Sequence, residues 1–136
     1  MASAALLQRL AQSEDPKRAL LREIGDVSGV SLLSARILVA IYVGPEKMKS
    51  GLYRPHSQLK EDIWQGTVGL VLKKGPSAFV DDQHHKFHGQ NIEIGQWVTF
   101  VPGEGKRVQI NGVDCRIIED TLINMVVEDP ELITHQ

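Results

Sequence analysis

Three histidines lie close together in the stretch DDQHHKFHG, at positions 84, 85 and 88. Imidazole is a common metal ligand, and the carboxylates of Asp81 and Asp82 precede it here, so this stretch could in principle hold a metal ion. However, a polar loop offers no preformed coordination geometry, and no cysteine supports the set. We therefore interpret His84, His85 and His88 as polar residues of a loop tip, and we expect neither a metal nor a cofactor.

Three other patterns suggest chemistry on first inspection. The stretch Pro102–Arg107 contains the Gly-Lys of a phosphate loop, but it lacks the earlier glycine, and Arg107 replaces the Ser or Thr that would hold magnesium. We interpret this stretch as a hairpin turn. Cys115 has no neighbouring base and is expected to be a buried structural thiol. Glu119 and Asp120 form a carboxylate pair that we expect to be a solvated cap. We therefore expect no enzymatic activity.

Composition narrows the classes of partner. The net charge is −2 and aromatic residues make up 5% of the chain, so Trp64 and Trp97 are expected to pack in a core or interface rather than to bind nucleic acid. No apolar run is long enough to span a membrane. The single cysteine fits a reducing compartment, and Gln8 and Arg9 interrupt the N-terminal apolar stretch, which argues against a signal peptide. We expect a cytoplasmic protein.

The elements that would position these residues change in character near residue 32. Leucines at helical spacing predict a first helix over Ser3–Ala11. A second helix is predicted after Asp15, a good N-cap followed by Pro16, and it should end at Gly25. The sequence therefore predicts a short helical N-terminal arm over residues 1–31. It would cover an apolar patch or edge of its own or a neighbouring subunit, or else act as a recognition arm for another protein.

The rest of the chain alternates between β-favouring runs and turn signals. Asn111-Gly112 is a strong signal for a two-residue hairpin. Short strands at such spacing are typical of a small all-β sandwich or barrel. The predicted strands cover residues 37–43, 66–72, 96–101, 108–110, 115–118 and 122–127.

The connection over residues 44–65 is long for a compact β domain, and connections of this length are usually functional or disordered. It is polar except for a few side chains, among which Leu52 and Tyr53 are adjacent. These two residues either pin the loop to the β domain or act as anchors for an apolar groove on a partner.

The order of these features resembles the GroES-like co-chaperonin family over nearly all of residues 33–128. LLSARILV resembles the first strand of that family, KSGLYRP its mobile loop, and GTVGLVLKKGP the strand that follows. Residues 78–93 fall where the family has a roof hairpin. IGQWVTFVPGEG and NGVDCRIIEDTLINMVV resemble its later strands, the last of which close the barrel and reach a neighbouring subunit.

This resemblance implies a mainly β fold, with a GroES-like barrel over residues 32–129 and a C-terminal tail over 130–136. The mobile loop would be 44–65 and the roof loop 75–93. The protein would form a ring, expected to be a heptamer, that caps a GroEL-like chaperonin and assists protein folding, with no active site of its own. The loop residues that would contact the chaperonin apical domain are Gly51, Leu52, Tyr53, Arg54 and Pro55.

Three features depart from the family pattern. Arg54 occupies the place of the third apolar anchor, Gln96 replaces the usual aspartate, and the N-terminal arm has no counterpart. These departures keep a second hypothesis open, because a fold does not fix a function. The same barrel could be a structural protein of a phage virion, such as a head decoration or connector component, that contacts capsid proteins.

Overall fold

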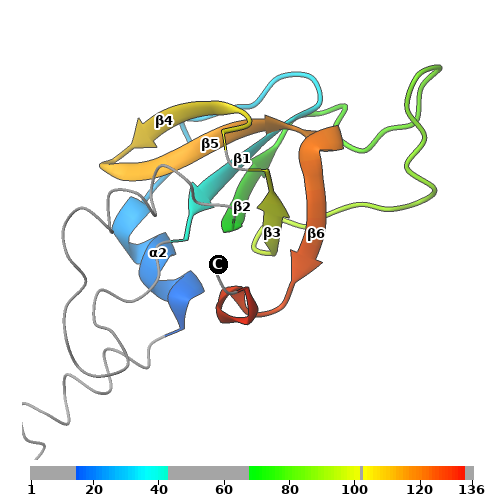
Figure 1. The fold of residues 1–136 in the computed structure, drawn as a ribbon. Coiled ribbons are helices and arrows are strands. Elements are labelled where there is room, and N and C mark those ends of the chain that lie inside the picture. The colour runs from blue at the N-terminus through cyan, green and yellow to red at the C-terminus, as the bar shows by residue number, and fades with distance from the viewer. Residues whose placement is uncertain (1–14, 43–67, 102, 134–136) are drawn as a thin grey trace, which may run out of the picture.

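The computed structural model describes residues 15–42, 68–101 and 103–133, which form one antiparallel sheet of six strands with a single α-helix packed on it (Figure 1). The sheet is strongly curved, and the helix lies below its β5–β1 half (Figure 1). The predicted helix over Ser3–Ala11, the predicted loop 44–65 and Trp64 lie outside the described residues. A small, mainly β domain, as expected from the sequence, is therefore confirmed.

Helix α2 spans Pro16–Ile24. The Asp15 side chain accepts a hydrogen bond from the amide of Lys17, so it caps the N-terminus as predicted. Gly25 has φ 69°, and its amide donates to the Leu21 carbonyl, which ends the helix in a left-handed residue. Both ends of the helix are thus determined by residues that the sequence makes recognisable.

The strands follow the order β4-β5-β1-β2-β3-β6 across the sheet. Asn111 and Gly112, with φ 51° and 82°, form the predicted tight turn between the first two of these strands. The bounds are β1 Arg36–Ile41, β2 Val68–Lys74, β3 Trp97–Phe100, β4 Lys106–Ile110, β5 Val113–Glu119 and β6 Ile123–Val127, with short 3-10 turns at Asp120–Leu122 and Pro130–Leu132.

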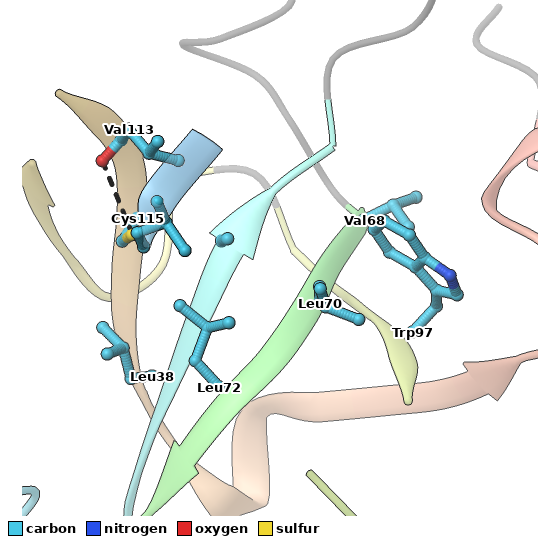
Figure 2. Close-up of a cluster of buried hydrophobic side chains, with 9 residues drawn as sticks. Leu38, Val68, Leu70, Leu72, Trp97, Val113 and Cys115 are labelled. Carbon is cyan, nitrogen blue, oxygen red and sulfur yellow. Dashed lines mark hydrogen bonds between the residues drawn. The ribbon is translucent and has the colours of Figure 1, made fainter. Parts of the chain in front are cut away.

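The two faces of the sheet are both buried along its centre, so β1 and β2 carry nearly continuous apolar runs. On one face, called here the helix face, strand residues such as Leu38 and Leu72 lie in one cluster (Figure 2). Ile24 of α2 belongs to the same cluster. On the opposite face, apolar strand residues such as Val39 and Phe100 pack with Ile92, Phe79 and other residues of the connections between strands.

Helix α2 belongs to the same core as the strands. Ile24 is 1% exposed, and Leu20 packs against the same cluster. The side-chain amide of Asn111, in the β4–β5 turn, donates to the Ile24 carbonyl at 2.6 Å. Helix α2 therefore covers an apolar face of its own sheet, which is one of the roles expected for the arm.

Two local expectations are wrong. The stretch after β3 is not a hairpin turn, because β3 pairs with β2 and β6 whereas β4 pairs with β5, so residues 103–105 connect distant strands of the sheet. Residues 75–96 form turns and no paired strands where a roof hairpin was expected. Here Asp81 and Asp82 bond nearby backbone amides, an arrangement that competes with strand pairing.

Within the described residues the sheet is open, with β4 and β6 as its edges. The described part of the chain also contains no helix that is long and apolar enough to cross a membrane.

Candidate functional site

The segment that carries the expected chaperonin-binding residues begins and ends at neighbouring points of the sheet. The Tyr42 amide donates to the Val68 carbonyl at 2.9 Å, so the residues on either side of segment 43–67 are directly bonded. The Tyr42 ring packs edge-on against Trp97, with ring centroids 5.5 Å apart. Trp97 is 3% exposed and lies in the core beside Val68 (Figure 2), which confirms its predicted packing role.

The residues expected to bind a chaperonin, Gly51, Leu52, Tyr53, Arg54 and Pro55, lie outside the described residues. The described structure therefore defines the base from which this segment departs. We expect this base to be rigid, because Tyr42 packs on the buried Trp97 and its amide is hydrogen-bonded to Val68 at the end of the β1–β2 pairing.

The roof loop, residues 75–93, is attached to the sheet at several points. The Phe79 amide donates to the Asp120 carboxylate at 2.9 Å, and Asp120 is only 5% exposed. The Lys74 ammonium donates to the Ile92 carbonyl at 2.6 Å and to the Asn91 side chain at 3.1 Å. The expectation that Asp120 is a solvated cap is therefore wrong, because this carboxylate is a buried acceptor that holds the start of the loop.

The tip of the roof loop is organised by two aspartates. The Asp82 carboxylate accepts hydrogen bonds from the amides of His85 and His84, which lower the pKa of this carboxyl. The Asp81 carboxylate accepts one from the amide of Phe87 at 2.7 Å. The Phe87 ring in turn packs edge-on against Phe79 at 5.2 Å. These bonds give the tip a defined shape without strand pairing.

The three histidines are exposed on this tip. His85 lies 3.7 Å from the Asp82 carboxylate and stacks on Phe87, whereas His88 lies beyond Phe87 with a left-handed backbone at φ 56°. Among residues 15–42, 68–101 and 103–133, no three His, Cys, Asp or Glu side chains are arranged to hold a metal ion. The tip thus presents imidazole groups to solvent, as predicted for a polar loop.

Cys115 lies in the core as expected. It is 1% exposed on the helix face, and its thiol donates to the Val113 carbonyl at 3.5 Å (Figure 2). Burial raises the pKa of the thiol to about 11, so it stays protonated near neutral pH. A protonated, enclosed thiol is a poor nucleophile, which supports the structural role predicted for this residue.

Sequence reasoning missed one further buried charge. Arg116, in β5, is 2% exposed and lies directly across from Val39 on one side and Arg107 on the other. Burial, and then the nearby Arg107, lower its pKa. The available signal in the sequence was the position of Arg116 inside an otherwise apolar, β-favouring run, Cys115–Ile118.

Among the residues that the structure describes, no strand pairs with the outer edge of β4 or of β6. β6 is an edge strand on which Met125 and Val126 are 46% and 45% exposed, on opposite faces of the strand. β4, at the other edge, begins with Lys106 and Arg107, both exposed. Open edges with exposed apolar side chains favour pairing with another chain.

The chain matches none of the known protein families searched, and no curated protein is similar to it in sequence.

Proposed function

We propose that the protein is a co-chaperonin-like ring component that caps the folding chamber of a GroEL-like chaperonin through the loop 44–65, which lies within segment 43–67, and has no catalytic activity of its own. In this proposal each subunit is a GroES-like barrel, which either closes on itself or is closed by contacts with neighbouring subunits. The subunits form a ring that is expected to be a heptamer. Leu52 and Tyr53 are the contacts buried in a groove of the chaperonin apical domain, with Gly51, Arg54 and Pro55 beside them.

The observation that carries this proposal is the base of the segment. Because Tyr42 and Val68 are hydrogen-bonded and Tyr42 packs on the buried Trp97, segment 43–67 is presented from one rigid point of the sheet. A binding segment held at both ends in this way is positioned relative to the ring, while its own residues contact the partner. The strands before and after this segment resemble, in the same order, strands of the GroES-like family, and this resemblance supports the same function.

The energetics suit a reversible cap. Burying one leucine-sized side chain gains roughly 1.5–3 kcal/mol, and ordering a binding segment offsets part of that gain. A single subunit would therefore bind weakly. Several copies on one ring would bind tightly through effective concentration and would still release when the chaperonin changes state. Arg54 lowers the apolar gain, or pairs with an acidic residue beside the groove.

The test is capture of the purified protein by a bacterial chaperonin in the presence and absence of ATP. We expect nucleotide-dependent capture by the wild type and loss of capture for Leu52→Asp. The matched control is Leu33→Asp, because Leu33 is 66% exposed and lies three residues before β1 rather than in the segment. Capture of all three proteins alike, or of none, would refute the proposal.

A second candidate is a structural protein of a phage virion built on the same domain. The open edges β4 and β6 favour it, since a shell component must join copies of itself or capsid proteins along such surfaces. It predicts no capture by a chaperonin under any nucleotide condition. It also predicts that the protein assembles into shells or binds to virus-like particles, which electron microscopy would detect.

A further inference from the structure

Asn111, in the β4–β5 turn, holds the C-terminal end of helix α2. Its side-chain amide donates to the carbonyl of Ile24, the last helical residue, at 2.6 Å and to the carbonyl of Asp26 at 3.3 Å. The last carbonyls of a helix have no partner within the helix and carry its partial negative charge. A neutral donor suits this position, whereas a negatively charged group that only accepts hydrogen bonds does not.

The residue that follows makes Asn111 chemically reactive. An asparagine side chain forms a cyclic imide when the backbone nitrogen of the next residue attacks its Cγ atom, and a side chain on that next residue hinders the attack. Asn111 precedes Gly112, which has no side chain, whereas the other two asparagines, Asn91 and Asn124, precede isoleucine and methionine. Asn111 and Gly112 are both exposed, and a Cβ atom built on Gly112 meets no described atom within 4 Å. The surroundings of the reacting nitrogen are therefore open.

We infer that Asn111 is a site of spontaneous deamidation, and that its product releases helix α2 from the β4–β5 turn. In the first step the bond between the Gly112 nitrogen and Asn111 Cγ forms, the bond between Cγ and Nδ2 breaks, and the Gly112 amide proton leaves with Nδ2 as ammonia. Water then opens the imide at one of its two carbonyl carbons. The product is an aspartate, or an isoaspartate whose main chain runs through the former side chain. Water is the only co-reactant, and no group is oxidised or reduced.

The product cannot make the contact that Asn111 makes. Its carboxylate is ionised at neutral pH and only accepts hydrogen bonds, so it cannot donate to the Ile24 carbonyl. It also places a negative charge at the negative end of α2, which is unfavourable. The isoaspartate in addition inserts a main-chain atom into a two-residue turn, whose shape depends on its length. Each product therefore favours the state in which the helix has left the turn.

The same contact slows the reaction in the folded protein. While Nδ2 is bonded to the Ile24 carbonyl, the Asn111 side chain is directed toward the helix and does not turn freely toward the Gly112 nitrogen. The reaction therefore takes place mainly when α2 has moved away, and its product prevents the helix from returning. We expect the folded chain to react about ten- to thousandfold more slowly than the unfolded chain, which is the range of a local opening.

The first measurement follows deamidation of the full chain at mildly alkaline pH, folded and in urea, by mass spectrometry of its peptides. In the folded chain we expect conversion of amide to acid at Asn111 to exceed that at Asn91 and Asn124. Urea should accelerate the conversion at Asn111 by about ten- to thousandfold. A ratio of rates outside this range, in either direction, would overturn the inference. Conversion of Asn91 or Asn124 that keeps pace with Asn111 in the folded chain would do so too.

The second measurement is hydrogen exchange of the amides in the peptide that covers α2. Asn111→Asp reproduces the aspartate product, and its α2 amides should exchange at least about tenfold faster than those of the wild type, with exchange in β1 and β2 unchanged. Aged wild type should show the same fast exchange in proportion to its converted fraction. This sample also provides the measurement if the variant does not fold.

The matched control is Asn111→Gly, which keeps the turn but cannot deamidate. Its α2 amides should exchange at a rate that does not change with age, and more slowly than those of Asn111→Asp, because only the aspartate adds a charge. Exchange in aged, converted wild type that equals exchange in fresh wild type would overturn the inference. None of these readouts involves a chaperonin, so their failure would leave the proposed function untouched.

Discussion

The backbone amide of Phe79 donates a 2.9 Å hydrogen bond to the carboxylate of Asp120, a residue 41 positions further along the chain. Asp120 follows β5 directly and is almost fully enclosed, so this bond fixes the start of the roof loop to the C-terminal end of β5. The Asp120 carboxylate is therefore the point at which the roof loop, residues 75–93, is attached to the end of β5.

Replacing Asp120 by alanine should lower the free energy of unfolding by about 1–3 kcal/mol, because the half-buried Phe79 amide loses its acceptor. Asp120→Asn keeps an acceptor oxygen at the same place and should lose clearly less. Urea unfolding of the two variants beside the wild type gives the comparison. Equal losses for both substitutions would show that the charge, rather than the acceptor, is what the site needs.

Asn111 has two functions that different substitutions separate. Its backbone, at φ 51°, forms the β4–β5 turn, and its side chain donates to the Ile24 carbonyl at 2.6 Å. Asn111→Gly keeps the turn and should lose about 1 kcal/mol for the hydrogen bond. Asn111→Ala should lose about 1 kcal/mol more, because alanine disfavours the left-handed conformation. Chemical denaturation measures both, and equal stability of the two variants would contradict this division.

Gly75 is required by close packing of the backbone rather than by an unusual φ angle. A Cβ atom there would lie 2.9 Å from the Leu33 carbonyl oxygen and closer still to that of Ser34. Gly75→Ala should therefore lower the free energy of unfolding by about 2–3 kcal/mol, through forced backbone movement. The control is Gly29→Ala, whose added atom meets nothing within 4 Å, and it should be neutral or slightly stabilising. If Gly75→Ala left the free energy of unfolding unchanged, the backbone at Leu33 and Ser34 would be able to move away from the added atom at little cost.

Cys115 predicts a specific dependence of stability on alkaline pH. The pKa of its thiol is about 11 in the folded protein and 9.0 in its ordinary state, so the unfolded chain releases the proton first as pH rises. The unfolded state then binds fewer protons, and the stability from this group falls between about pH 9 and pH 11, by about 1–2 kcal/mol. Below pH 8 the contribution should be complete.

The comparison for this prediction is Cys115→Ala, which lacks the titrating thiol but keeps every other group. The stability advantage of the wild type over the variant, measured by urea unfolding at a series of pH values, should shrink above pH 9. An advantage that stays constant from pH 7 to pH 11 would contradict the burial argument. Native thiol labelling at pH 8 should be slow and should become fast on unfolding.

Local signals predicted the elements whose cause is local. Asp15, Pro16 and Gly25 bound a helix because capping acts within one turn, and Asn111-Gly112 sets a hairpin because two residues with positive φ suffice. The strand positions followed from β-favouring runs for the same reason. The expected binding residues Gly51–Pro55 lie outside the described part of the chain, so that part of the candidate site remains a prediction.

What the sequence did not predict depends on distant partners. Asp120 is held by Phe79, which is distant in the sequence, and no local pattern marks this contact. Arg116 is buried in β5 between β4 and β1, and its only local signal is its position inside an apolar run. The stretch before β4 has glycines typical of a hairpin turn, but only the strand order shows that it connects strands that do not pair. Pairing order is set by burial over the whole domain, which a local pattern does not contain.

The pairing of β1 with β5 has a consequence for synthesis of the chain. Arg36 lies opposite Glu119, so the central strand β1 acquires one of its two neighbours only after residue 119 has left the ribosome. Until then the apolar β1 has an exposed edge, which is the kind of surface that aggregates or recruits other proteins. The protein that we propose assists the folding of others is therefore itself prone to aggregate, or to recruit other proteins, while it is being synthesised.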